Sequence, residues 1–176
     1  MGELMNQLPP EIQIHIKGIT KSAGLADDEE SYEKMAKGWL DKKKIFEEQI
    51  ADQDMIEIES LGVEDSKGAV ALTYSGSLVL IGPLVDGYRK AAYNSIGIRK
   101  NVPDSMVQEN SKLSSEVAIN SPIEFEVGPV KSTSSIFKIA VCKDDLDAIE
   151  QEEKISEVTV VMTNEFVNVN KDLIPV

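Results

Sequence analysis

The spacing of apolar residues changes once along this chain, near residue 54, and this change constrains the fold most. Before it, apolar side chains recur at helical spacing over residues 28–52: Tyr32, Met35, Ala36, Trp39, Phe46 and Ile50. After it, short β-branched runs alternate with polar residues and turn signals, which is typical of strands. A chain that begins as helices and continues as strands favours an α+β fold.

The helix predicted over residues 28–52 has favourable ends. An aspartate can cap its start, and Glu29 and Glu30 complement the helix dipole in the first turn. A shorter helix is predicted over residues 9–19, where two prolines stand at its first positions. The apolar residues of this shorter segment also alternate, so a strand is the alternative there.

Strands are predicted for the middle of the chain. Residues 69–73 and 78–81 flank a Tyr-Ser-Gly-Ser turn, which indicates a β-hairpin. Residues 123–127 alternate apolar residues with glutamates, as expected for a strand with one buried and one wet face. Further strands are expected at residues 55–58 and 135–141, where β-branched residues are frequent.

Three segments are harder to assign. Residues 87–98 are predicted as a helix or an irregular crossover, because asparagine and glycine weaken a helix there. Residues 144–153 are predicted as a short acidic helix with Leu146 and Ile149 facing inward. Residues 155–169 fit a helix nearly as well as a strand, and their β-branched run favours the strand.

The resulting prediction is an α+β fold whose antiparallel sheet is sandwich-like or a partial barrel. The sheet comprises residues 55–142, with 156–168 as a further strand, and N-terminal helices pack on one face or one end. The chain divides into a helical segment, 1–54, and a β-rich core, 55–176, which together form one cooperative domain. An all-β sandwich with a helical arm is the alternative architecture.

The net charge of −13 is unevenly distributed. Residues 1–54 hold 7 basic and 12 acidic side chains, and residues 143–176 hold 3 and 9, whereas residues 55–142 hold 8 and 10. Phosphate backbones and anionic membrane surfaces repel so acidic a chain, so neither nucleic acid nor a membrane is an expected partner. The nearly neutral middle leaves room for a small anionic ligand.

Catalysis that depends on several histidines or cysteines is excluded, because the chain has one of each. Cys142 follows an apolar run and is expected to be a buried, inert thiol. No pattern of metal ligands, phosphate-binding loop or nucleophile motif is present, so we expect no cofactor, no metal and no catalytic residue. The sequence shows no leader or membrane-spanning stretch, which leads us to expect a cytoplasmic protein.

A basic cluster in the middle of the chain is the candidate ligand-binding site. It consists of Tyr88, Arg89, Lys90, Arg99 and Lys100 and includes both arginines of the chain. Arginine presents a planar fork of donors that suits carboxylate or phosphate groups. The alternative is that these cations pair with the acidic ends of the same chain or of a neighbouring subunit.

A second set of residues is the candidate surface for a protein partner. It comprises Tyr32, Trp39 and Phe46 on the long helix and Ile174 and Val176 in the apolar C-terminus. The simplest interpretation of the aromatic residues is packing against the sheet. If the helices stand off the sheet, the same residues form a contact surface.

Together these features predict a non-catalytic acidic interaction or assembly module that associates with itself. The acidic ends and the central basic cluster favour pairing between copies. The alternative function is a small anionic-ligand-binding protein, or an enzyme for such a ligand, that uses Arg89 and Arg99. The direction in which the two guanidinium groups point discriminates between them.

Overall fold

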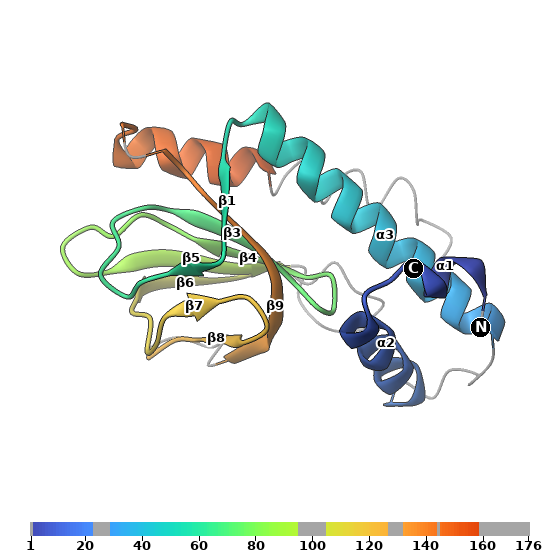
Figure 1. Ribbon diagram of the computed structural model, residues 1–176. Helices are drawn as coiled ribbons and strands as arrows, with labels where there is room; N and C mark the ends of the chain where they lie inside the picture. Colours follow the sequence, from blue (N-terminus) through green and yellow to red (C-terminus); the bar gives the residue numbers. More distant parts are fainter. Residues whose placement is uncertain (1, 23–28, 95–104, 127–131, 144, 159–176) are drawn as a thin grey trace.

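Figure 1 shows the computed structural model, which describes residues 2–22, 29–94, 105–126, 132–143 and 145–158. Its helices are α1 (Glu3–Asn6), α2 (Pro10–Ser22), α3 (Glu29–Asp52) and a helix over residues 148–158. The two helices predicted in the first part of the chain are confirmed. α2 starts at a proline, and α3 carries two glutamates in its first turn, as its N-terminal dipole favours.

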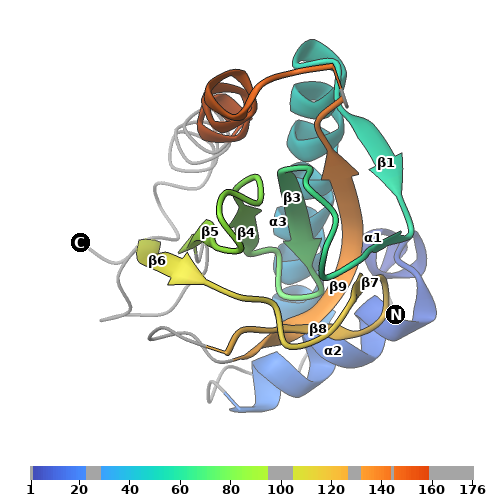
Figure 2. The same cartoon turned by 90° about the vertical axis from the view of Figure 1, so that its left-hand side faces the viewer.

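The strands form a seven-stranded, antiparallel sheet that does not close into a barrel. Its order is β1 (Ile56–Ile58), β9 (Ser132–Val141), β3 (Ala69–Thr73), β4 (Leu78–Ile81), β5 (Arg89–Asn94) and β6 (Ser105–Ser111), with β8 (Pro122–Glu124) also on β9. β2 (Ser60–Leu61) and β7 (Val117–Ala118) form a separate pair. The long strand β9 curves from β8 towards β1, as Figure 2 shows, so the fold is α+β as predicted.

Each face of the sheet buries its own cluster of apolar side chains. Along β3, Val70 and Leu72 belong to one cluster and Ala71 to the other, as the alternation of a strand requires. The first cluster lies under α3 and the 148–158 helix, which contribute Phe46 and Ile155. The second lies on the opposite face, where β7 and β8 also contribute side chains. The sheet is therefore covered on both sides.

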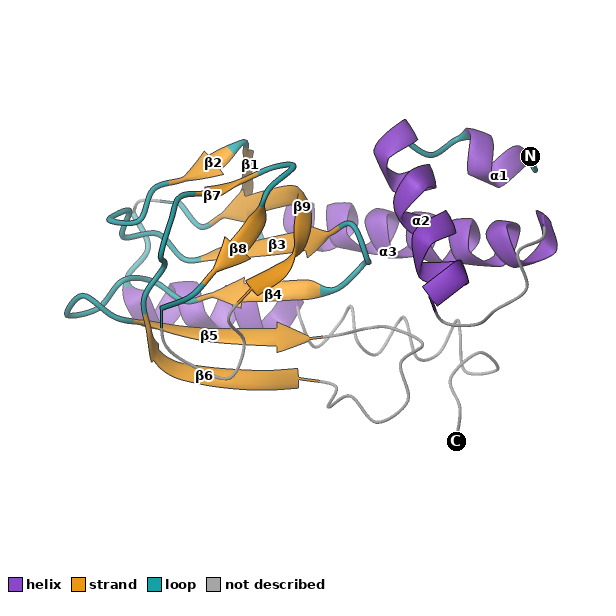
Figure 3. Ribbon diagram, turned by 90° about the horizontal axis from the view of Figure 1, so that it is seen from below, coloured by secondary structure: helices purple, strands orange, loops and turns teal. Residues whose placement is uncertain are grey.

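α1, α2 and the N-terminal half of α3 form a helical arm beyond one end of the sheet (Figure 3). The arm has a small apolar core of its own: Met5, Leu8, Ile12, Ile16, Ala36 and Trp39. Trp39 also joins the arm to the sheet, because its indole N–H donates to the Tyr74 carbonyl at 3.0 Å and its ring meets that of Phe137 edge-on, with centroids 4.8 Å apart. No helix in the described ranges is long and apolar enough to cross a membrane.

Several sequence-based predictions were wrong, two of them about the type of secondary structure. β5 occupies residues 89–94, where a helix or an irregular crossover was predicted, because pairing with β4 and β6 on both sides outweighs its weak local pattern. Residues 155–158 are helical although a strand was favoured for 155–169. The remaining residues of that segment, 159–169, lie outside the described residues.

The acidic helix starts later than predicted and turns a different face inward. It begins at residue 148 instead of 144 and is helical as far as residue 158, where the described residues end. Ile149 is 70 % exposed, which corrects its predicted inward orientation, whereas Ile155 and Val158 are buried. Leu146 precedes the helix and packs against the cluster under α3, as expected. Cys142 is buried as predicted, and burial raises the pKa of its thiol to about 11.

Gly82, at the end of β4, allows a close approach between β4 and β5. Its N–H donates to the Lys90 carbonyl at 2.7 Å, and a Cβ there would lie 2.8 Å from that same oxygen. We expect Gly82→Ala to lower the free energy of unfolding by about 1–3 kcal/mol, because backbone cannot move aside as a side chain can. Urea denaturation would measure this.

Gly38 is the matched control, because a Cβ there meets nothing within 4 Å. It lies inside α3, so Gly38→Ala should stabilise the protein by roughly 0.5–1 kcal/mol through helix propensity. A Gly82→Ala variant that is as stable as Gly38→Ala would contradict the close approach of β4 and β5.

Candidate functional site

The guanidinium group of Arg89 lies inside the protein and links three points of backbone. Its Nη1 donates to the carbonyl oxygens of Lys67 and Gly82, each at 2.9 Å, and its Nη2 donates to the carbonyl oxygen of Asp65. Arg89 is only 2 % exposed. Because Asp65 and Lys67 precede β3 and Gly82 follows β4, Arg89 ties two loops together at one end of the sheet.

This role suits arginine chemically. A guanidinium group has five donors in one plane and can hold several carbonyl oxygens at once. Burial lowers the pKa of Arg89, while the carboxylates of Glu64 and Asp65 act in the opposite direction, and an arginine stays charged at neutral pH. The N–H groups of its guanidinium either donate to backbone oxygens or are buried. Arg89 therefore does not offer the accessible pair of donors that an external anion requires.

The neighbours of Arg89 point the other way. Adjacent residues in a strand face opposite sides, and Lys90 is exposed, with its Nζ 3.7 Å from an oxygen of Glu152 on the 148–158 helix. Tyr88 is 43 % exposed, and the Nζ of Lys112 lies 4.9 Å from the centre of its ring. Within the predicted basic cluster, Tyr88 and Lys90 therefore reach solvent whereas Arg89 does not.

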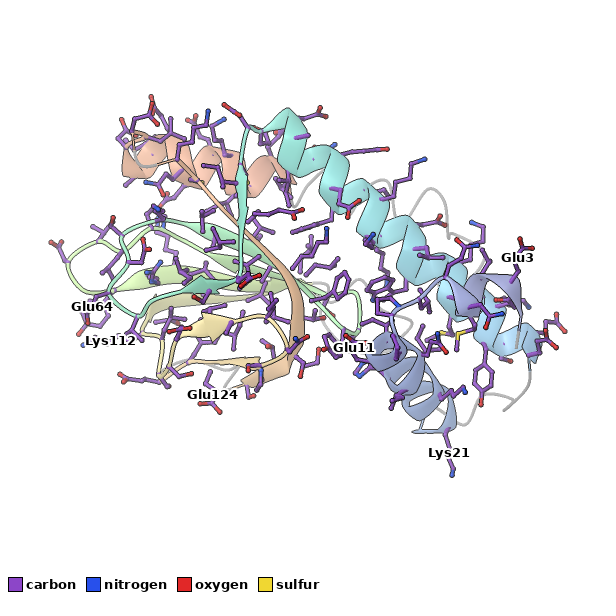
Figure 4. The ribbon with its side chains drawn as sticks, in the orientation of Figure 1. Glu3, Glu11, Lys21, Glu64, Lys112 and Glu124 are labelled. Atoms are coloured by element: carbon purple, nitrogen blue, oxygen red, sulfur yellow. The ribbon has the colours of Figure 1, made fainter. Side chains whose placement is uncertain are left out.

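The two loops that Arg89 holds carry exposed apolar residues. Val63 stands on the loop before β3, and Val85 and Tyr88 stand on the loop after β4. The N–H of Leu84 donates to the Ser66 carbonyl at 3.1 Å, so the loops also meet through backbone. We call Val63, Val85 and Tyr88 the loop surface. Glu64 follows Val63 in the chain, and Lys112 contacts the Tyr88 ring. Figure 4 shows both at the end of the sheet away from the helical arm.

The other predicted site residues are placed differently. Phe46 is fully buried and Trp39 is 4 % exposed, so both pack inside the chain. Packing was the simpler of the two interpretations of these aromatic residues. Tyr32 is half-buried against the core of the helical arm. The remaining candidates lie outside the described residues: Arg99, Lys100, Ile174 and Val176.

Sequence reasoning missed a chain of polar contacts between the helical arm and the sheet. The Ser75 hydroxyl, in the β3–β4 turn, forms hydrogen bonds with Ser134 Oγ at 3.2 Å and with His15 Nε2 at 2.9 Å. Burial lowers the pKa of His15. These residues are 59 or more positions apart in the chain, and no local signal connects them. Their contacts dock α2 on the sheet.

The described part of the chain contains no group of three or more histidine, cysteine, aspartate or glutamate side chains that could hold a metal ion. Comparisons with protein-family models, with curated proteins and with solved structures found no match to this chain. Any functional proposal therefore rests on the contacts and exposure of the described residues.

Proposed function

We propose that this chain is a non-catalytic interaction module that associates with itself. The hydrogen bonds of Arg89 to backbone carbonyls carry the proposal: one of the two arginines proposed for an anion site instead fixes two loops and leaves their apolar residues outside. A rigidly held apolar surface binds another protein without the entropy cost of ordering its loops. A small anion would gain little from the valines and tyrosine of the loop surface.

The charge distribution supports contacts through this part of the molecule. Residues 55–142 hold 8 basic and 10 acidic side chains, so two copies can approach there with less repulsion than at their acidic ends. Because the whole chain carries −13, added sodium chloride should strengthen association by screening that repulsion. An anion site would show the opposite response, since salt competes with an ionic ligand.

Light scattering at increasing protein concentration tests the proposal. We expect the molar mass to rise above the 19.3 kDa of one chain, and to rise further with sodium chloride. Replacing Val85 and Tyr88 together by serine should weaken association on the order of tenfold to a hundredfold, because aromatic and aliphatic anchors dominate such contacts.

Ile14→Ser is the matched control. Ile14 is 72 % exposed on α2, in the helical arm, so this variant removes apolar surface away from the loops. It should associate as the wild type does. A wild-type chain that stays monomeric at every concentration would refute the proposed function.

A further inference from the structure

The helical arm contacts the sheet at the turn between β3 and β4. Figure 1 shows this turn reaching from the sheet towards α2. Trp39 of α3 donates to the Tyr74 carbonyl in the turn at 3.0 Å, and the His15 ring of α2 meets the Tyr74 ring edge-on, with centroids 5.9 Å apart. His15 Nε2 also lies 2.9 Å from the hydroxyl oxygen of Ser75. One short turn therefore contacts two helices of the arm.

His15 is the only histidine of the chain, and histidine is the side chain whose ordinary pKa lies between about 5 and 8. Burial lowers the pKa of His15 from its ordinary value of 6.5. A protonated ring can still donate to Ser75, so the hydrogen bond itself does not oppose protonation. The cost comes from placing a positive charge where water is partly excluded.

The sheet side of this contact presents uncharged groups to His15 within the described residues. The turn contributes Tyr74 and Ser75, and β9 contributes Ser134, whose Oγ lies 3.2 Å from that of Ser75. Burial and the Glu11 carboxylate raise the pKa of Tyr74, so its phenol is neutral at and below neutral pH. These groups do not compensate a positive charge on the His15 ring.

Two charged side chains lie near the same contact. Glu11 precedes His15 by about one turn of α2 and is exposed, so solvent screens its charge. Lys42 of α3 brings a cation beside the turn, since a Cβ on Gly76 would lie 2.9 Å from its Nζ. No attraction from a described carboxylate opposes the effect of burial on the pKa of His15. The docked arm therefore favours a neutral imidazole.

We infer that mild acid releases the helical arm from the β3–β4 turn, with His15 as the group that takes up the proton. Water can surround a charged imidazole on the released arm, whereas docking removes part of that water. The docked arm binds fewer protons than the released arm, so docking weakens as pH falls below 6.5. Above this pH His15 is neutral in both states, and docking has its full strength.

The arm can leave the turn without unfolding, because it has an apolar core of its own that includes Met5, Ile12 and Ala36. α3 belongs to both parts of the molecule, since Ala36 lies in the core of the arm and Phe46 lies under the sheet. Gly38 stands between these two positions and weakens the helix where it would have to bend.

Trp39 makes the release observable, because it is the only tryptophan of the chain and donates to the turn itself. We expect its fluorescence emission to shift to longer wavelength between about pH 7.5 and about pH 5, a range above the ordinary pKa of carboxylates. The midpoint should lie below 6.5. Far-ultraviolet circular dichroism should stay constant, since the helices and strands persist.

His15→Gln is the variant that tests the role of the proton, because glutamine keeps a donor and an acceptor for Ser75 but does not titrate. Its emission should not change over this pH range. Ile14→Ser is the matched control, at the neighbouring exposed position of α2, and should respond to pH as the wild type does. An equal response of His15→Gln and the wild type would overturn the inference.

The pKa of His15 can also be measured by NMR on the wild-type chain, which decides the matter even if His15→Gln does not fold. A value below 6.5 is expected, and a value of 6.5 or higher would refute the inference. Wild-type emission that is constant with pH would refute it as well. So would a loss of the circular dichroism signal over the same range, because the whole chain would then be unfolding.

Discussion

Replacing Arg89 by methionine is expected to lower the free energy of unfolding by roughly 3–5 kcal/mol, the largest effect of any change considered for this chain. The variant leaves the carbonyl oxygens of Asp65, Lys67 and Gly82 without their donor. Two loops then lose their common anchor, and β5 loses its link to them. Denaturation by urea, followed by circular dichroism, would give the difference.

Lys90→Met is the matched control, because it makes the same kind of change at the next position. Lys90 is exposed and its ion pair with Glu152 is long, so its loss should change stability by less than about 0.5 kcal/mol. Adding phosphate should leave the melting temperature of the wild type unchanged. If Arg89→Met were as stable as the wild type and abolished a stabilisation by phosphate, Arg89 would be a ligand-binding residue instead.

Lys42 should make the stability of the protein depend on pH in the alkaline range. It lies on α3 and is 7 % exposed, and burial lowers its pKa to about 8 from 10.5. The unfolded chain therefore binds more protons than the folded chain between these values, so folding is favoured increasingly as pH rises through them. Relative to Lys42→Met, the wild type should gain roughly 3 kcal/mol at most between pH 7 and pH 10.5.

Urea denaturation of both proteins across this pH range would measure that gain. Taking the difference from Lys42→Met removes the contribution of the other lysines and the tyrosines. Lys44→Met, at an exposed position of the same helix, is the control for removing a lysine from α3. A difference between wild type and Lys42→Met that is the same at every pH would contradict a lowered pKa.

The elements that the sequence predicted well are those whose signals are local. The β3–β4 hairpin was predicted at its observed residues because a turn separates two short apolar runs that pair with each other. α3 was predicted because its apolar spacing and its acidic first turn agree. In both cases the residues that decide the structure are neighbours in the chain.

β5 and Arg89 show what local signals miss. β5 has little alternation of its own and depends on two partner strands, one of them more than ten residues away in the chain. Once β5 is known to be a strand, the burial of Arg89 follows, since Ala91 two positions on is buried and residues two apart share a face. The sequence identified the arginine as important, but only the strand assignment shows that it points inward.

Sedimentation equilibrium of the wild-type chain, at low and moderate sodium chloride, tests the central claim that this protein acts by binding a copy of itself. We predict a monomer–dimer equilibrium that shifts towards the dimer as salt screens the charge of −13. A single species of 19.3 kDa under all these conditions would contradict the claim.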